Sequence, residues 1–382
     1  MKRISIAIAL AAGLCGSQFA IAASLPPIPT AIISELSGTG ATAGTNFKDG
    51  LVMALKEINA AGGVLGRQVS YDILDSQSTP SVARAMAQKA VDSGADVVFG
   101  PGFSGSVIVS MRVTQQAKIP NIVGAEAANI TQEGDPYIFR TSFSQMSSMP
   151  KVERYLKNVI KAKSVAMLWV NNDFGKGGRD VLASELKKNH IPVVADISSD
   201  PGQIDFTAAV LKAKQSNADA LFVYLNEEES ARVLRELRKQ GYSKPIIGET
   251  TLAGEKVVEL AGDAANGVVC HVGLTVDAPS PLLKSFGERF QKIYGYKPDH
   301  NGIKGYTAAY MMKAGFEKAG KIDPQALDKA LHGLYISTKK YPGILMNVKI
   351  DNKGDLDRDS YMVKVENDKA HVFMTLPPLS PM

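Results

Sequence analysis

The stretch DVVFGPGFSGSVIVSMRVTQQAKIPNIV, residues 96–123, gives the clearest indication of how this chain folds. It starts with an apolar run at 96–99, continues with a helical pattern from about Ser106 to Lys118, and ends with a second apolar run at 121–123. Two short apolar runs that flank one helix are typical of parallel strands joined by a helical crossover. The stretch therefore predicts a βαβ unit with buried strands.

The same alternation of strands and helices continues on both sides of this unit. On the N-terminal side, 30–33 and 69–74 are expected strands and 46–59 is an expected helix. A further helix starts at Ser78-Thr79-Pro80, which supplies an N-cap hydroxyl and a first-turn proline. On the C-terminal side a second set begins after a polar stretch at 141–149. The expected strands of this second set lie at 165–170, 193–197, 220–225 and 245–247.

The end of the chain has a different pattern. Residues 343–351, 360–365 and 371–375 alternate between apolar and polar side chains, as antiparallel strands do. The chain is therefore predicted to be α/β, with two sets of parallel strands and a short antiparallel part. In open parallel sheets, ligands bind beyond the carboxyl ends of the strands, where helix N-termini attract anions. Two sets that face each other would enclose one shared cleft.

The first residues have the pattern of a secretory signal peptide. Lys2 and Arg3 form a short positive region, 4–14 is apolar and uncharged, and Ala20-Ile21-Ala22 supplies small residues for cleavage. The apolar run is shorter than the roughly 20 residues that a membrane-spanning helix needs. We expect a signal peptide at residues 1–22, cleavage near Ala22 and export to the periplasm.

The remaining chain has the size and composition of an ordinary globular protein. It would have about 360 residues, which is too many for one hydrophobic core, so two domains are expected. Its formal net charge would fall from +5 to +3, because only two basic residues leave, and this is too weak to indicate a nucleic-acid partner. Cys270 would be the only remaining cysteine. It lies in an apolar run, which predicts a small buried side chain and no internal disulfide.

Catalytic motifs are weak or missing. The sequence GTGATA at 38–43 matches a dinucleotide-binding G-x-G-x-x-A pattern, but four residues separate it from the preceding strand. The next acidic residues at a strand end, Asp72 and Asp75, come over 30 residues later, where about 20 are expected. No G-x-S-x-G, H-E-x-x-H or C-x-x-C occurs, the 5 histidines are far apart, and no base is evident for Ser104. We therefore expect no enzyme activity, no cofactor and no metal site.

Six short stretches carry a family resemblance. They are LSG at 36–38, ALKEINAAGGVLG at 54–66, DILDSQST at 72–79, NNDFG at 171–175, LAGDAANG at 260–267 and DNKGD at 351–355. Together they resemble the leucine/isoleucine/valine-binding proteins, the type I periplasmic binding proteins of ABC transporters, over about residues 27–365. The resemblance implies two Rossmann-like lobes joined by a three-crossover hinge. One lobe would comprise 24–142 and 273–338, and the other 143–272 and 339–376.

The resemblance also implies a function for this fold. A monomer would capture a small-molecule solute between its lobes as they hinge shut, without changing the solute chemically. The closed form would then dock on the membrane permease subunits of an ABC importer.

The ligand-binding residues of the family fall at the ends of the predicted strands. Ser104 would hold an anionic group with its hydroxyl and with helix N-terminal amides, and Phe103 lies beside it. Backbone groups of Gly124 and Ala125 would contact the ligand. Phe174, an aromatic residue before a glycine, would pack on the ligand.

Several positions depart from the family pattern. Glu126 stands where the family has a threonine that binds an ammonium group, and Glu227 stands where it has a tyrosine. The acidic partner of the ammonium group is expected at Glu249, although Thr250 beside it is an equally possible contact. A family tyrosine in the first loop is missing near Ala43. The resemblance therefore predicts the position of the site but not the identity of the ligand.

Three functions remain open. The first is a receptor for an amino acid, either branched-chain-like or another small one. The second is a receptor of the same family for a solute such as an aromatic carboxylate, an amide or a urea-like compound, which the missing tyrosine and threonine favour. The third, a secreted dehydrogenase or hydrolase, would need a nucleotide at Gly38 or a base near Ser104. Carboxylates at Glu126 and Glu227 would favour a cationic or donor-rich ligand, unless Glu227 is only part of an acidic first helical turn.

Overall fold

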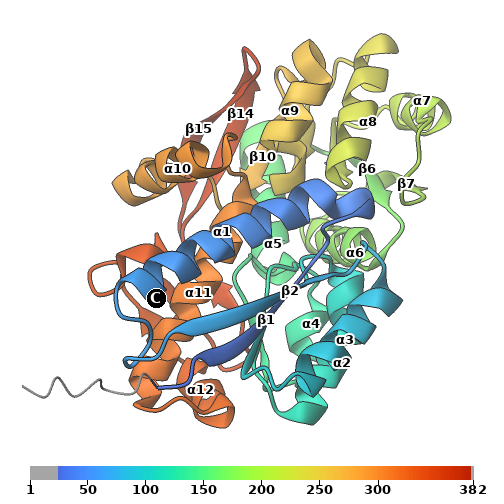
Figure 1. Ribbon diagram of the computed structural model, residues 1–382. Coiled ribbons are helices and arrows are strands. Elements are labelled where there is room, and N and C mark those ends of the chain that lie inside the picture. The colour runs from blue at the N-terminus through green and yellow to red at the C-terminus, as the bar shows by residue number, and fades with distance from the viewer. Residues whose placement is uncertain (1–24, 380–382) are drawn as a thin grey trace, which may run out of the picture.

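The computed structural model describes residues 25–379, so the predicted signal peptide at 1–22 lies outside the described residues. Two sheets carry the fold, and helices flank both of them (Figure 1). The first sheet has five strands in the order β2-β1-β3-β4-β5, and the second has seven in the order β15-β14-β10-β9-β8-β6-β7. This arrangement confirms the predicted α/β class. Between residues 25 and 379, none of the helices has both the length and the apolar character that crossing a bilayer requires.

All strands of the first sheet run parallel. They are β1 (Ile28–Ser34), β2 (Val69–Asp75), β3 (Val97–Phe99), β4 (Asn121–Val123) and β5 (Ile138–Arg140). The helices between them are α1 (Ala41–Ala60), α2 (Pro80–Asp92), α3 (Ser104–Ala117) and α4 (Asn129–Gln132), and the 3-10 turn η1 (Gly38–Gly40) precedes α1. The βαβ unit predicted at 96–123 is thus confirmed as β3-α3-β4, although its helix begins at Ser104 rather than at Ser106.

Three later helices pack back against this part of the molecule. They are α10 (Pro281–Tyr294), α11 (His300–Ala319) and α12 (Pro324–Leu331). The first two contact α1, and α12 contacts α11 (Figure 1). The backbones of α1 and α11 come close because glycines lie at the contact: a Cβ on Gly305 would be 2.0 Å from the carbonyl oxygen of Phe47. This close contact positions the N-terminal part of α11, and with it Lys304.

The second sheet contains both parallel and antiparallel strands. The parallel strands are β6 (Val165–Val170), β7 (Val193–Ser199), β8 (Ala220–Tyr224), β9 (Ile246–Gly248) and β10 (Val269–Val272). The antiparallel strands predicted at 360–365 and 371–375 are present as β14 (Ser360–Glu366) and β15 (Lys369–Leu376). Of the stretch predicted at 343–351, only 348–350 is a strand, and it belongs to a separate small sheet. The helical segments are α5 (Gln145–Tyr155), η2 (Leu156–Ile160), α6 (Asp173–Lys188), α7 (Thr207–Gln215), α8 (Glu227–Lys239), η3 (Thr250–Ala253), α9 (Glu255–Ala261) and η4 (Gly262–Ala265).

The two sheets share one strand order. In the first sheet the order is β2-β1-β3-β4-β5, and in the parallel part of the second it is β7-β6-β8-β9-β10. The two orders are the same when β6 is matched with β1, β7 with β2, and so on. In each sheet the first strand therefore lies between the second and the third. The loops that leave the first and third strands diverge to opposite faces, which opens a crevice beyond their carboxyl ends. Each sheet thus has one such switch point, at β1/β3 and at β6/β8.

Along the chain, the strands of a small third sheet come after α12 and before β14. It consists of β11 (Tyr335–Ile336), β12 (Val348–Ile350) and β13 (Leu356–Asp357), and the 3-10 turn η5 (Pro342–Ile344) lies within it. The backbone N–H of Arg140 in β5 donates to the carbonyl of Gly354 at 2.9 Å, so this segment is tied to the first sheet. The chain passes between the two large sheets after β5, after β10 and between β13 and β14. We propose these passages as the three crossovers, with the last at 358–359 instead of 338–339.

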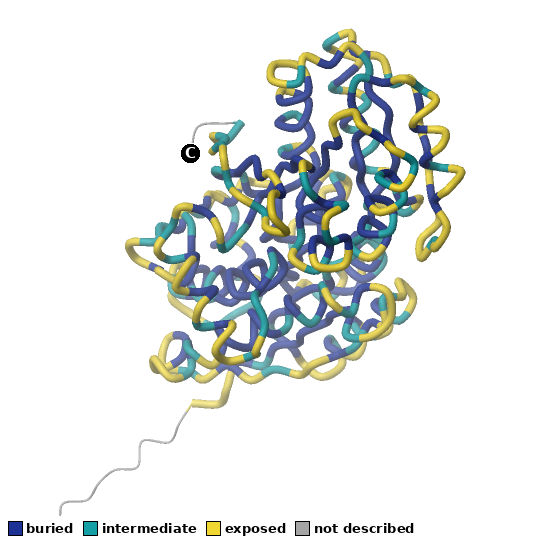
Figure 2. Tube along the Cα trace, turned by 90° about the horizontal axis from the view of Figure 1, so that it is seen from above, coloured by how far each residue is buried: buried dark blue, intermediate teal, exposed yellow. Residues whose placement is uncertain are grey.

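Burial follows the layers of the fold. Most strands and the inner faces of the helices carry buried residues, although the edge strand β15 alternates between exposed and partly buried positions. Exposed residues lie mainly at the periphery of the molecule (Figure 2). Cys270 in β10 is buried, as its apolar surroundings predict.

Candidate functional site

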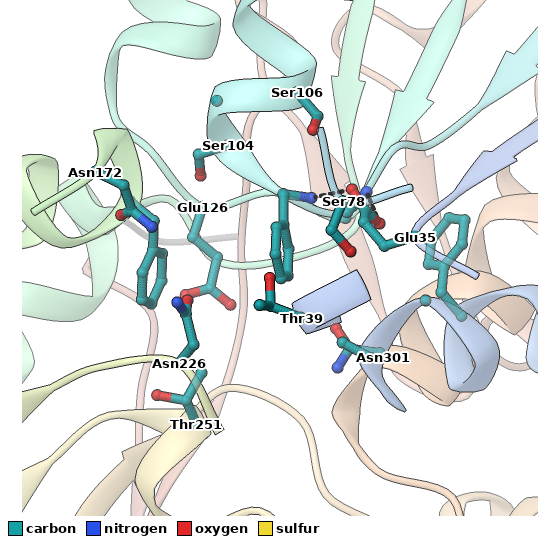
Figure 3. Close-up of a pocket in the computed structure, with 18 of the residues that line it drawn as sticks. Glu35, Thr39, Ser78, Ser104, Ser106, Glu126, Asn172, Asn226, Thr251 and Asn301 are labelled. Atoms are coloured by element: carbon teal, nitrogen blue, oxygen red, sulfur yellow. Dashed lines mark hydrogen bonds between the residues drawn. The ribbon is translucent and has the colours of Figure 1, made fainter. Parts of the chain in front are cut away.

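A cavity of about 260 Å³ lies between the two large sheets (Figure 3). Both switch points border it, with Glu35 and Phe103 following β1 and β3, and Asn172 and Glu227 following β6 and β8. The start of α1 and the first turn of α11 complete the wall. They contribute Ala43, Gly44, Phe47, His300, Asn301 and Lys304. The carboxyl edges of the two sheets therefore share one site.

Glu35 fixes the loop that leads into α3. Its carboxylate accepts hydrogen bonds from the backbone N–H groups of Gly102 at 3.1 Å and Phe103 at 2.9 Å. Burial raises the pKa of this carboxyl group, and the two amide hydrogen bonds oppose the rise. Because Glu35 occupies these two amides, they are not available to a ligand. The loop is held in place by the protein itself.

The first turn of α3 provides donors on the first-sheet side of the cavity. Ser104, Gly105 and Ser106 all line it, and the first N–H groups of a helix have no partner within the helix. The hydroxyl of Ser104 accepts a hydrogen bond from the backbone N–H of Ala127 at 3.2 Å, which leaves its own proton to donate. Ser106 is only 1% exposed, and within the described chain its hydroxyl has no hydrogen-bond partner. This end of the cavity suits an anionic or strongly accepting group.

A buried ion pair lies beside these donors. The Lys304 ammonium group on α11 donates to Glu126 Oε1 at 2.8 Å, and the two side chains are 6% and 10% exposed. Burial raises the pKa of Glu126, and the neighbouring Lys304 opposes the rise. Next to the pair, burial lowers the pKa of His300 well below its usual value, so this imidazole is neutral at neutral pH. The pair brings one negative and one positive charge to the cavity wall.

Glu227 provides a carboxylate from the second sheet. It is the first residue of α8, directly after the N-cap Asn226. Burial raises the pKa of Glu227 to about 7, Asp299 and Glu126 add to the rise, and Lys304 opposes it. In the described part of the chain this carboxylate forms no ion pair. It is therefore available for a ligand.

The remaining wall of the second sheet is both aromatic and polar. Phe174 stacks on Tyr224 with ring centroids 4.2 Å apart, and Phe174 lines the cavity. Thr251 in η3 is 7% exposed and also lines it, and its hydroxyl has no partner among residues 25–379. Figure 3 shows Asn226 and Thr251 on the side of the cavity opposite Ser104 and Ser106.

Most of the residues expected at the ligand lie together in the structure. Those that line the cavity are Phe103, Ser104, Gly124, Glu126, Phe174 and Glu227. Ala125, Glu249 and Thr250 do not line it. The Ala125 carbonyl accepts hydrogen bonds from Arg140 and Ser142, which cover it.

The structure also places the expected ammonium partner away from the cavity. Glu249 is 1% exposed, His271 Nδ1 lies 2.8 Å from its Oε1, and its other oxygen accepts from the N–H of Thr250. Thr250 lines two smaller hollows nearby. The carboxylate of Glu249 is therefore bonded within the protein. Among the described residues, Glu227 is the expected site residue that lines the cavity with a carboxylate outside any ion pair.

Several lining residues were not expected from the sequence. Glu35, Asn172 and Asn226 directly follow or lie close to the ends of β1, β6 and β8, so the rule for ligand positions in parallel sheets would have identified them. Lys304 had no such signal, since it lies 178 residues from Glu126 along the chain. Within residues 25–379 there is also no group of acidic, histidine and cysteine side chains that could hold a metal ion.

Two sheets that repeat one strand order enclose this cavity, and helix N-termini and side chains from both sheets line it, as expected for a solute-binding protein with two lobes. The chain belongs to the periplasmic binding protein family, whose model matches residues 27–370.

Several known proteins resemble the chain over most of its length. The leucine-, isoleucine-, valine-, threonine- and alanine-binding protein of Pseudomonas aeruginosa is 27% identical over 88% of this chain and 89% of its own. The branched-chain amino acid transporter substrate binding protein LivJ of Streptococcus pneumoniae, in complex with isoleucine, is 25% identical with a TM-score of 0.81, over 91% and 99% of the two chains. A solute binding protein of Rhodopseudomonas palustris, in complex with 3,4-dihydroxy benzoic acid, has a TM-score of 0.84 at 23% identity, over 93% and 98%.

Proposed function

We propose that this protein is the periplasmic substrate-binding component of an ABC importer and that it captures an amino acid between its two lobes. The observation that carries the proposal is the pairing of opposite groups across one cavity. The α3 amides with Ser104 and Ser106 suit a carboxylate, and Glu227 suits an ammonium group. The ligand contacts would be Phe103, Ser104, Ser106, Gly124, Glu126, Phe174, Glu227 and Thr251.

Capture would work by a shift in the balance between open and closed forms. Ser104 begins α3, which follows β3 of the first sheet, and Glu227 begins α8, which follows β8 of the second. A ligand therefore contacts both groups only when the two sheets lie close together. Because the closed form alone offers both sets of contacts, the ligand stabilises it. The closed monomer would then dock on the permease subunits, and no chemical step is needed.

A panel of solutes in thermal unfolding tests the proposal. At about 1,000 times its dissociation constant, a true ligand should add about 4 kcal/mol to the free energy of unfolding and raise the melting temperature by several degrees. The panel should contain amino acids, amides, amines and aromatic acids, together with any compound that mass spectrometry finds in the purified protein. If no member of such a panel raises the melting temperature, the proposed function is wrong.

A second candidate ligand class has one observation in its favour. Glu249, the expected partner of an α-ammonium group, is bonded to His271 and does not reach the cavity. A solute of another kind, such as an aromatic carboxylate, an amide or a urea-like compound, would not need that partner. Pairs such as phenylalanine and phenylpropionate in the same panel separate the two candidates, since only an amino-acid receptor should prefer the member with the amine.

Replacing Ser106 with alanine should weaken ligand binding without destabilising the ligand-free protein. Among residues 25–379 the hydroxyl has no hydrogen-bond partner, so its removal leaves no other group there unsatisfied. Loss of one hydrogen bond to the ligand, about 1 kcal/mol, corresponds to roughly fivefold weaker binding in calorimetry.

Ser110→Ala is the matched control for this change. Ser110 is buried on the same helix, but its hydroxyl donates to the Val107 carbonyl at 3.3 Å and it does not line the cavity. This variant should bind as the unmodified protein does. Equal loss of affinity in both variants would show that Ser106 acts through the helix rather than on the ligand.

A further inference from the structure

The charges that line the cavity are unbalanced. Four carboxylates border it, on Glu35, Glu126, Asp173 and Glu227, whereas Lys304 provides the one ammonium group among the described lining residues. His300 adds no positive charge, because burial lowers its pKa well below the usual value. A neutral zwitterion such as leucine would leave this excess of negative charge uncompensated.

The protein itself compensates only part of this charge. Glu35 accepts two backbone hydrogen bonds, and Lys304 bonds one oxygen of Glu126, so neither carboxylate is without a partner. Glu227 has no ion pair within residues 25–379, and Asp299, the N-cap of α11, adds negative charge near it. Glu227 is only partly exposed, and removing a carboxylate from water without a counter-charge is costly, so a cation bound on this side of the cavity would be stabilised.

Two buried hydroxyl groups independently indicate a polar ligand. Ser106 and Thr251 are 1% and 7% exposed, both line the cavity, and neither hydroxyl has a partner in the part of the chain that the structure describes. Buried polar groups are normally hydrogen-bonded, and unpaired ones at a cavity are satisfied when it is filled. They lie on opposite sides of the cavity (Figure 3), so the ligand needs polar groups at both ends.

We propose that the solute carries a net positive charge, as a basic amino acid or a small amine or guanidine does, and that its cationic group lies between Glu227 and Glu126. This inference rests on the proposed function and names the substrate class of the same site. The rings of Phe103 and Phe174, which also line the cavity, offer faces on which a cation is stabilised. Glu126 lies in the loop after β4 of the first sheet, and Glu227 begins α8 after β8 of the second, so a cation between them also stabilises the closed form.

Isosteric ligand pairs that differ in charge test the inference by calorimetry. Arginine and citrulline form one pair, and lysine and norleucine form another. The cationic member of at least one pair should bind at least tenfold more tightly than its neutral partner. Glu227→Gln should reduce this preference by about tenfold, whereas Glu228→Gln should leave it within about twofold. Glu228 is the next residue along, it is exposed and bonded to Arg232, and it does not line the cavity.

The dependence of binding on pH gives a second readout. Burial raises the pKa of Glu227 to about 7, with Asp299 and Glu126 adding to the rise and Lys304 opposing it. The carboxylate is thus protonated below that pH, so affinity for a cation should increase between about pH 6 and pH 8. The increase should vanish in Glu227→Gln. At pH 8 and without ligand, this variant should unfold at the same temperature as the unmodified protein or at a higher one.

The outcomes separate this inference from the proposed function. If neutral solutes bind as tightly as their cationic partners, or more tightly, the protein is still a solute receptor but the charge inference is wrong. If neither these pairs nor any member of the thermal-unfolding panel binds, the proposed function itself is wrong. If the charge preference survives in Glu227→Gln, the cation is not held by this carboxylate and the inference is overturned.

Discussion

Lys304→Met is expected to lower the free energy of unfolding by about 3–5 kcal/mol and to abolish tight ligand binding. The ammonium group of Lys304 is bonded to Glu126 at 2.8 Å, and both side chains are nearly excluded from solvent. Methionine fills similar space but leaves the carboxylate of Glu126 buried without its counter-charge. Urea unfolding at fixed pH measures the loss.

The loss should depend on pH in a defined direction. Burial already raises the pKa of Glu126, and Lys304 opposes the rise, so removing Lys304 raises this pKa further. Burying a protonated carboxyl group costs less free energy than burying a carboxylate, because the neutral group loses less hydration. The variant should therefore be destabilised less at pH 5 than at pH 8, because its stability is lost as the pH rises through the new pKa of Glu126.

Two further variants show whether the pair is responsible. Adding Glu126→Gln to Lys304→Met removes the unpaired charge and should restore more than half of the lost stability. Lys297 forms ion pairs with Glu255 and Asp277, and the side chains of the three residues are 34–56% exposed. Lys297→Met should therefore lower the free energy of unfolding by no more than about 1 kcal/mol. Equal losses for Lys304→Met and Lys297→Met would contradict the structural role of the buried pair.

Arg140→Met is expected to cause a second large loss, again about 3–5 kcal/mol, together with weaker ligand binding. The Arg140 side chain is 0% exposed, and its Nε donates to Asp355 at 2.6 Å. Its two terminal nitrogens donate to the carbonyls of Ala125 at 2.6 Å and Ala127 at 3.1 Å. Hydrogen bonds from one guanidinium group thus hold the loop that follows β4 and carries Glu126.

Arg112→Met is a matched control for this change. Arg112 pairs with Glu133 at the surface, where its side chain is 51% exposed, so its loss should change stability by about 1 kcal/mol or less. Adding Asp355→Leu to Arg140→Met should restore only part of the stability, because the carbonyls of Ala125 and Ala127 still lack the hydrogen bonds that the guanidinium group donated. Full restoration would show that the guanidinium serves Asp355 alone and does not position the ligand loop.

The local pattern of the sequence determined the fold class and the general position of the site. Apolar runs at 96–99 and 121–123 with a helix between them predict β3-α3-β4 from neighbouring residues alone. Parallel strands place their carboxyl ends at one edge, which predicts a ligand cleft there, whereas the assignment of Ser104 to that cleft came from the family resemblance. The resemblance to one family extended this reading along the chain, and the family is confirmed.

Only the tertiary structure decided which charged groups are free for a ligand. Glu126, Glu227 and Glu249 all follow strands and look equivalent in the sequence. Lys304 pairs with Glu126 from 178 residues away, and His271 is bonded to Glu249, which leaves Glu227 as the unpaired carboxylate of the three within the described residues. Hydrophobic periodicity is a local property, whereas ion pairing depends on contacts between elements that are distant in the sequence. The sequence therefore indicates where the cavity forms, and the packing of α11 and of the second sheet determines the charge that it presents.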